Sequence, residues 1–306
     1  MHINRLNLVL NYAHRNWNKP IQLSRLADVA CMSQFHFSRM FRQYTGESPV
    51  GFVKRIRFEN SAHMLCFQQT QSIGNIAFNC GFSSNQTFTR AFTKEFGNSP
   101  REFRKLFGNN LEKALLPDQA NQYADHITPG IIESDSNSSN PDINLVQIPP
   151  TRVAYFRSIG GYGFSDDIDL AIASIRHWAQ RNEFWNKETK IIGASWDNNR
   201  ITPNTFCKYD ACIQIPQNIT IESDVSTQIL PGGLYAVFRS PFQTSGEISL
   251  IWRYFNELIA KTPKFKNYYT SSKPCFEVFD YNNLTQEHEI ELYIRMNRLP
   301  VGEPLI

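Results

Sequence analysis

In the first hundred residues of the chain, apolar side chains recur with the period of an amphipathic helix, and the pattern occurs twice. Segments 34–44 and 85–96 each carry four apolar residues on one face, at spacings of one helical turn. In chain order these residues are Phe37, Met40, Phe41 and Tyr44, then Phe88, Ala91, Phe92 and Phe96. A shorter amphipathic segment precedes each longer one, at 23–30 and at 73–79. Within each pair, a turn of three or four residues separates the short segment from the long one. A further helical segment, 4–17, comes before both pairs.

The two pairs also share the residues that follow them. Each longer segment reads Phe-x-Arg-x-Phe, beginning at Phe37 and again at Phe88, and Gly, Ser-Pro and Phe follow at the same distances. We therefore expect two helix-turn-helix units, at about 20–45 and 70–97. One helix over 48–66 is expected to join them at a fixed distance. Adjacent major grooves on one face of DNA lie about 34 Å apart, and tandem units on one chain can read both without dimerising.

Charge is divided unevenly between the two parts of the chain. Residues 1–110 hold 14 Lys and Arg against 5 Asp and Glu, whereas residues 111–306 hold 17 against 23. A basic half that coincides with the repeated helices is typical of a nucleic-acid binder. Double-stranded DNA is therefore the expected partner of the first half.

The polar face of each longer helix supplies the side chains that would enter a major groove. In the first helix they are Gln34, Phe35, Ser38, Arg39 and Arg42; in the second they are Asn85, Gln86, Thr89, Arg90 and Lys94, with Thr87 near the edge. Arg pairs with guanine, Gln and Asn pair with adenine, and Thr or Phe contacts the thymine methyl group. An ordinary solvated helix surface is the alternative, but it explains neither the repeat nor the charge.

The remaining composition argues against several other classes of protein. The six cysteines include no Cys-x-x-Cys pair, and Cys207 and Cys212 have no nearby His pair that would complete a zinc site. The first residues contain no apolar secretory core, and no run of 18 apolar residues occurs. We therefore expect no metal, no cofactor, no membrane span and a cytoplasmic location.

The composition changes after residue 108. Asn109-Asn110, Pro117 and Pro129-Gly130 punctuate segment 109–142, and its run 133–141 is polar and cannot bury enough apolar surface to fold on its own. It is therefore expected to be a linker between a DNA-binding domain, 1–108, and a second domain, 143–306.

The second domain carries its own repeat, with a period of about 81–83 residues, in which Phe156-Arg-Ser recurs as Phe238-Arg-Ser. Each copy reads strand, helix, strand, strand. The predicted helices cover 166–182 and 246–261, and the strands cover 191–196, 209–215, 275–280 and 289–296. The predicted fold class is therefore multidomain: an all-α tandem helix-turn-helix domain followed by an α+β pseudo-twofold domain. A cleft between the two copies would be a typical ligand site.

Residues 4–107 resemble the AraC-type DNA-binding domain. The resemblance rests on the run Ile73-x-x-Ile76-Ala77-x-x-Cys80-Gly81-Phe82-Ser83 and on Gly97-Asn-Ser-Pro100. The subgroup that these residues most resemble is that of Rob and MarA, which implies a monomer on asymmetric DNA sites and recruitment of RNA polymerase. The resemblance places base-reading side chains at Phe35, Ser38, Arg39, Asn85, Gln86, Thr89 and Arg90. Phe35 and Ser38 stand where those relatives carry Trp and Gln.

Residues 143–306 resemble the GyrI-like effector domain, through Lys273-Pro-Cys-Phe-Glu-Val-Phe279, Ile290-Glu-Leu-Tyr293 and Ser195-Trp-Asp-Asn198. The resemblance implies an aromatic cleft that holds one acidic residue and accepts cationic or bulky apolar compounds. A carboxylate among aromatic rings attracts a lipophilic cation by charge and by cation–π contact. Glu291 aligns with the acidic position of the family, and the expected walls are Tyr162, Trp196, Tyr235, Trp252 and Tyr293. The alternatives are core packing for each aromatic residue and an exposed strand carboxylate for Glu291.

These expectations favour a transcription regulator, an activator, whose second domain senses a small hydrophobic or cationic effector. Two alternatives stay open for that domain. Glu291 and Tyr293 could supply acid–base chemistry to a hydrolase, but the sequence shows no set of nucleophile, base and orienting residue, so no enzyme is expected. An acidic domain could also bind a basic protein.

Overall fold

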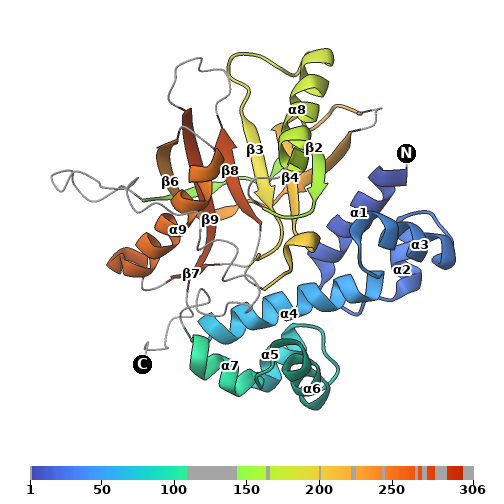
Figure 1. The fold of residues 1–306 in the computed structure, drawn as a ribbon, viewed down its shortest axis with the longest axis vertical. Helices are drawn as coiled ribbons and strands as arrows, with labels where there is room; N and C mark the ends of the chain where they lie inside the picture. The colour runs from blue at the N-terminus through green and yellow to red at the C-terminus, as the bar shows by residue number, and fades with distance from the viewer. Residues whose placement is uncertain are drawn as a thin grey trace.

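The computed structural model describes residues 2–108, 143–162, 166–199, 201–221, 225–242, 245–265, 268–270, 274–279 and 288–298. The expected linker, 109–142, lies outside the described residues. Figure 1 shows a helical part at the N-terminal end of the chain and a sheet-containing part that packs against it. Among the helices that the structure describes, none is long and apolar enough to cross a membrane.

The helical part follows the predicted pattern closely. Its helices are α1 (His2–Asn16), α2 (Leu23–Val29), α3 (Gln34–Thr45), α4 (Pro49–Phe67), α5 (Ile73–Asn79), α6 (Asn85–Phe96) and α7 (Pro100–Phe107). The two helix-turn-helix units are α2–α3 and α5–α6, and α4 joins them without a break. Each predicted helix end lies within two residues of the observed one.

The repeated residues between the helices are caps and turns. Ser33 and Ser84 accept a hydrogen bond from a backbone N–H in the first turn of α3 and α6. Gly46 and Gly97 end those helices with φ angles of 77° and 72°, a left-handed conformation that favours glycine. The Ser-Pro pairs that follow begin α4 and α7, with Ser as N-cap and Pro in the first turn. The same local rules therefore build both units.

Helix α4 contributes to the core of both units. Its first half gives Phe52, Val53 and Ile56 to the core that contains Phe37 and Phe41. Its second half gives Phe58, Ala62 and Leu65 to the core around Phe88, Phe92 and Phe103. Because one continuous helix is buried in both cores, the two recognition helices α3 and α6 are held in a fixed relative position.

The second part is an antiparallel sheet with two helices. Its strands are β1 (Asn144–Ile148), β2 (Thr151–Ile159), β3 (Ile191–Ser195), β4 (Lys208–Gln214), β5 (Ser226–Leu230), β6 (Gly233–Phe242), β7 (Tyr268–Thr270), β8 (Cys275–Phe279) and β9 (His288–Arg298). The helices are α8 (Asp166–Arg181) and α9 (Ser245–Lys261), with short 3-10 turns at Asn204–Phe206 and Pro263–Phe265. The strand order is β1-β6-β9-β8-β3-β4-β2-β5, and β7 pairs with β9.

This order is a palindrome of two strand-helix-strand-strand copies, which confirms the pseudo-twofold prediction. The copies are β2-α8-β3-β4 and β6-α9-β8-β9, and they meet where β3 pairs with β8. The described residues also form three strands that the pattern did not predict, β1, β5 and the short β7. Two of them are exchanged between the copies: β1 pairs with β6 of the second copy, and β5 pairs with β2 of the first.

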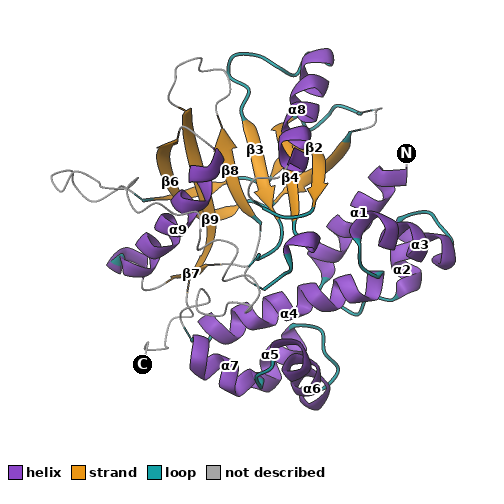
Figure 2. Ribbon diagram, in the orientation of Figure 1, coloured by secondary structure: helices purple, strands orange, loops and turns teal. Residues whose placement is uncertain are grey.

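Both helices cover the same face of the sheet (Figure 2). Ala211, Gly193, Glu277 and Leu292 stand opposite one another across β4, β3, β8 and β9. Ala211 belongs to the core under α8 and Leu292 to the core under α9. The other face of the sheet carries a separate cluster that includes Trp196, and α1 packs on this side.

Candidate nucleic-acid interface and effector site

The predicted DNA-facing side chains lie on open faces of α3 and α6. Phe35 is 82% exposed, an unusual setting for a phenylalanine. Gln34, Arg39, Arg42, Asn85, Gln86, Thr87, Arg90 and Lys94 are also exposed, and Ser38 and Thr89 are half-buried. Their opposite faces supply Phe37, Phe41, Phe88 and Phe92 to the two cores. The structure therefore orients both faces as the periodicity predicted.

These faces have the chemistry that a nucleic acid requires. In the part of the chain that the structure describes, no carboxylate makes an ion pair with Arg39, Arg42, Arg90 or Lys94. Their charges are therefore available for phosphates or base edges. Thr87 is partly occupied in the helix cap, because Ser84 Oγ donates to Thr87 Oγ1 at 2.9 Å.

In the second domain, Glu291 lies on the face of β9 that points away from α8 and α9. Tyr293 donates its hydroxyl to Glu291 Oε2 at 2.7 Å, and the guanidinium of Arg239 makes an ion pair with Oε1. Partial burial would raise the pKa of Glu291, but these hydrogen bonds outweigh it and hold the pKa below its ordinary value. Much of the charge of Glu291 is therefore already compensated within the protein.

The structure does not bring the six expected ligand residues together. Tyr235 is fully buried, stacks on Phe276, and donates its hydroxyl to a backbone carbonyl oxygen. Trp196 belongs to the same cluster on the face away from the helices, whereas Trp252 packs on the opposite face. Tyr162 lies at the end of the sheet, where its hydroxyl donates to the Lys208 carbonyl oxygen at 3.0 Å. The sheet itself therefore separates Trp252 from Glu291, Tyr293, Trp196 and Tyr235.

A different carboxylate lies among aromatic rings on the helix-covered face. Glu277 of β8 is 9% exposed. Its Oε2 accepts a hydrogen bond from the Tyr209 hydroxyl at 3.0 Å, and its Oε1 accepts one from Trp252 Nε1 at 2.6 Å. Both donors are neutral and both belong to aromatic rings. Glu277 also stands where the two pseudo-twofold copies meet, directly opposite Gly193 of β3.

Gly193 makes room for this arrangement. A Cβ atom at position 193 would lie 1.9 Å from the Tyr209 hydroxyl oxygen, so the tyrosine ring occupies the space that any other side chain would fill. The sequence contained a signal for this site: a carboxylate inside the strand Cys275–Phe279, and a glycine inside the strand Ile191–Ser195. The prediction from the sequence weighed only the aligned residue, Glu291.

Comparison with known proteins matches both parts of the chain to families. Residues 141–297 match the GyrI-like small molecule binding domain, and residues 26–106 match a helix-turn-helix domain. These matches confirm the predicted types of the two domains. The Rob and MarA subgroup and the boundaries at 108 and 143 stay predictions.

Curated relatives match the helical part. The SPbeta prophage-derived putative transcriptional regulator YosT of Bacillus subtilis is 34% identical over 96 residues, which are 31% of this chain and 63% of that protein. The HTH-type transcriptional activator RhaS of Escherichia fergusonii is 32% identical over 101 residues, which are 33% of this chain and 36% of that protein. The chain thus spans less than two thirds of either relative. Among solved structures, the DNA-binding domain of AdpA in complex with a target DNA has 27% identity and a TM-score of 0.33, and the match covers 34% of this chain and 93% of that one.

Proposed function

This chain belongs to the GyrI-like small molecule binding family, and from that premise we propose that it is a one-component transcription regulator. The helical part reads double-stranded DNA, and the sheet domain senses a small hydrophobic or cationic effector. The observation that carries the proposal is the presence on one chain of two exposed basic helix faces, without ion pairs to the described residues, and of a buried carboxylate among aromatic rings. The curated relatives, which are transcriptional regulators, support the same reading.

The DNA-binding half of the proposal is tested with Arg39 and Arg90. Both project from the open face of a recognition helix and lie at equivalent positions in the two units. Each change to Ala is expected to cost about 1–3 kcal/mol on a duplex selected by the full chain from random sequences, and to relax base preference at one position. Lys261→Ala is the matched control, because this exposed lysine lies on α9 of the second domain. Equal losses on selected and random duplexes would assign these arginines to phosphate contacts alone.

The effector half of the proposal places the cation-binding carboxylate at Glu277. A lipophilic cation would gain both the charge of Glu277 and the faces of the rings of Tyr209 and Trp252. Tetraphenylphosphonium and neutral triphenylphosphine oxide form a suitable pair of probes for calorimetry on the full chain. Glu277→Gln is expected to weaken binding of the cation about tenfold or more, and to affect the neutral probe little.

Glu291→Gln is the matched control for that experiment. It removes a carboxylate that already has Arg239 and Tyr293 as partners, so we expect a small effect on the cation. A large loss of cation affinity with Glu291→Gln and none with Glu277→Gln would contradict the assignment to Glu277 and support Glu291, the carboxylate that the sequence predicted.

Further parts of the proposal follow from the resemblance to the Rob and MarA subgroup. They are action as an activator, contact with RNA polymerase and binding to DNA as a monomer; a cytoplasmic location is proposed separately, from the composition of the chain. The regulator reading is preferred to a hydrolase because the curated relatives are transcriptional regulators. Hydrolysis of a labelled hydrophobic ester by the full chain, abolished by Glu277→Gln, would contradict this preference.

A further inference from the structure

Three asparagines of α1 hold the sheet domain against the helical domain. Asn4, Asn7 and Asn11 are spaced by three and four residues, so they lie on one face of the helix. Ser226 Oγ of β5 donates to Asn4 Oδ1 at 2.9 Å and accepts from Asn7 Nδ2 at 3.0 Å. Asn11 Nδ2 donates to the Tyr155 hydroxyl at 3.0 Å. Because Asn7 and Asn11 are each only 2% exposed, these bonds are shielded from water.

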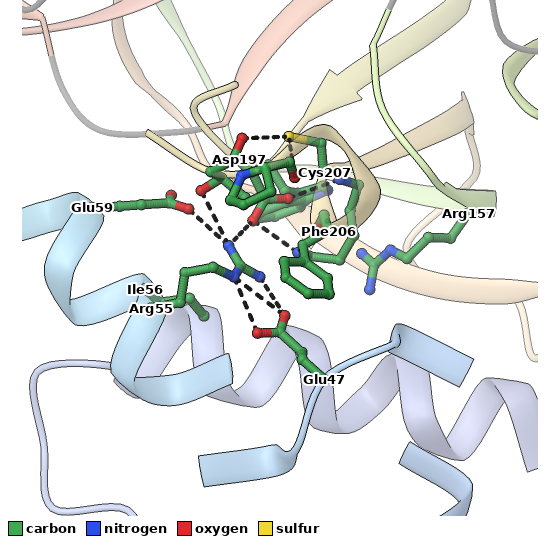
Figure 3. A network of polar contacts seen from close by, with 12 residues as sticks. Glu47, Arg55, Ile56, Glu59, Arg157, Asp197, Phe206 and Cys207 are labelled. Carbon is green, nitrogen blue, oxygen red and sulfur yellow. Dashed lines mark hydrogen bonds and ion pairs between the residues drawn. The ribbon is translucent and has the colours of Figure 1, made fainter. Parts of the chain in front are cut away.

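A charged cluster joins the two domains at α4 (Figure 3). Arg55 Nη2 lies 2.6 Å from Glu47 Oε1, and its Nη1 lies 2.7 Å from Glu59 Oε1 and 2.9 Å from Asp197 Oδ1. Lys208 Nζ lies 2.8 Å from the same Asp197 oxygen. Burial would raise the pKa of Asp197, but Lys208 and Arg55 together hold it well below its ordinary value. Asp197 is therefore a buried anion shared between β4 of one domain and α4 of the other.

Strand β4 connects this interface to the candidate effector site. Tyr209 points to the helix-covered face and donates to Glu277 at 3.0 Å. Its neighbours in sequence point to the opposite face, as the alternation of a strand requires. Lys208 binds Asp197, and Asp210 accepts two hydrogen bonds from Arg157, at 2.6 and 2.7 Å.

The second of these contacts also reaches the helical domain. Arg157 Nη2 donates to Asn11 Oδ1 at 3.0 Å, so the chain of contacts runs from Asp210 through Arg157 to α1. The other chain runs from Lys208 through Asp197 to Arg55 on α4. Of three consecutive residues, Tyr209 contacts the candidate effector site, and Lys208 and Asp210 reach the helical domain through Asp197 and Arg157.

We propose that Lys208, Tyr209 and Asp210 of β4 couple effector binding at Glu277 to the position of α1 and α4, and thereby to the two recognition helices. The inference rests on the proposed function and specifies its regulation. Nine of the eleven predicted DNA-facing side chains of α3 and α6 are exposed while the domains are docked, and the other two, Ser38 and Thr89, are half-buried, so the docked sheet domain leaves these faces open. The effector therefore acts through the position of α1 and α4, which carry the two recognition helices, and not by uncovering them.

The packing around Tyr209 explains why a ligand would move the strand. A cation that binds Glu277 competes for the carboxylate oxygen that accepts the Tyr209 hydroxyl. The ring of Tyr209 is 3% exposed and packs against Gly193 in the core under α8, so it has little freedom to move alone. Protein interiors transmit such displacements because they are close-packed.

The docked interface is also imperfectly satisfied. Among the described residues, His14 Nε2 and Arg157 Nη1 are buried without a hydrogen-bond partner. His14 lies between Phe52 of α4 and Trp196 of the sheet domain, with ring centroids 5.5 and 5.1 Å away. Burial and the nearby Lys208 lower the pKa of His14, so it is neutral in this position. A buried polar group without a hydrogen-bond partner lowers the free energy gained on docking, because water would satisfy it when the two surfaces separate. This lower gain makes rearrangement of the interface easier.

The test measures the coupling factor of the full chain, which is the factor by which bound cation changes the dissociation constant for the duplex. The dissociation constant for the selected duplex is measured by fluorescence anisotropy without and with saturating tetraphenylphosphonium. We expect a change of about 5- to 150-fold in wild type, and the same factor when duplex is present and the cation is titrated, because linkage is reciprocal. Asn11→Ala and Tyr209→Phe are expected to bring the factor close to one. Tyr254→Phe, in α9 and away from this path, is expected to keep the wild-type factor.

Asp197→Asn provides a second interface variant, with circular dichroism as the check on folding. If wild type binds both the cation and the duplex but the coupling factor between them is one, the inference is overturned and the proposed function stands. If the factor is wild-type in Asn11→Ala, Tyr209→Phe and Asp197→Asn, then β4 is not the route and the inference is likewise overturned. Failure of wild type to bind either the cation or DNA would overturn the proposed function together with this inference.

Discussion

Replacing Arg55 with methionine would remove a guanidinium that lies within 2.9 Å of three carboxylates. Methionine keeps an unbranched apolar stem but cannot neutralise Glu47, Glu59 or Asp197. Asp197 keeps Lys208 as a partner at 2.8 Å, so the loss falls mainly on the two glutamates. Removing one partner of a buried ion pair typically costs about 3–5 kcal/mol. We expect a loss of unfolding free energy in that range at pH 8.

The cost should be smaller in mild acid, because Glu59 can take up a proton. Burial, opposed by Arg55, raises the pKa of Glu59 to about 7. A carboxyl whose pKa is raised on folding contributes stability that is fully present below its unfolded value of about 4.5 and is lost as the pH rises through about 7. At pH 5.5 most Glu59 is therefore neutral and does not require Arg55. The groups that face it are Arg55, Asp197 and Lys208.

Urea unfolding at pH 5.5 and pH 8, followed by intrinsic fluorescence, measures both effects. Glu59→Gln in the Arg55→Met background is the matched control, since it removes the charge that the first change leaves uncompensated. We expect this double variant to recover part of the loss at pH 8 and almost none at pH 5.5. A loss below about 1 kcal/mol at pH 8, or an equal loss at both pH values, would refute the reasoning.

Three further substitutions test separate parts of the structure. Gly193→Ala should displace the Tyr209 ring, whose hydroxyl oxygen lies 1.9 Å from the new Cβ atom, and should weaken cation binding in calorimetry. Normal cation binding would show that the ring moves freely. Ser99→Ala removes the hydroxyl oxygen that accepts a hydrogen bond from the Glu102 backbone N–H at 3.3 Å in the capping box of α7, and should lower stability by about 0.5–2 kcal/mol in thermal unfolding. An unchanged stability would show that this cap contributes nothing. Phe92→Ala should cost about 3–5 kcal/mol, because Phe92 is fully buried in the second core, and a loss below 1 kcal/mol in urea unfolding would contradict that burial.

Much of the helical domain is encoded in short stretches of sequence, which is why it could be predicted. The ends of α3, α4 and α6 depend on signals that involve only neighbouring residues. These signals are the helical period, the Ser caps, the glycines in the left-handed conformation and the Ser-Pro pairs at which helices begin. The outward faces of α3 and α6 followed from the same period, because Phe37 and Phe88 must point inward. The sequence repeat likewise predicted the two copies in the sheet domain.

The choice of carboxylate depended on tertiary structure. Alternation along β9 puts Glu291 and Leu292 on opposite faces, but it does not say which face the helices cover. The register of the strands places Glu277 of β8 opposite Gly193 of β3 and opposite Leu292 of β9. Glu277 therefore lies on the same face as Leu292, which belongs to the core under α9. Those partners come from distant parts of the chain, and no local pattern relates them.

The sequence by itself therefore determined the two domain types, the repeats and the outward faces of α3 and α6, since these depend on periodicity and on nearby turns. Tertiary structure alone decided the strand exchange of β1 and β5, the environment of Glu277, and the docking of α1 and α4 on the sheet domain. The docking contacts join residues 142 or more positions apart, as in Arg55 with Asp197 and Asn11 with Tyr155. In sequence, Asn4, Asn7 and Asn11 read as an ordinary polar face of a surface helix. Only the folded chain supplies the partners that make burying them favourable.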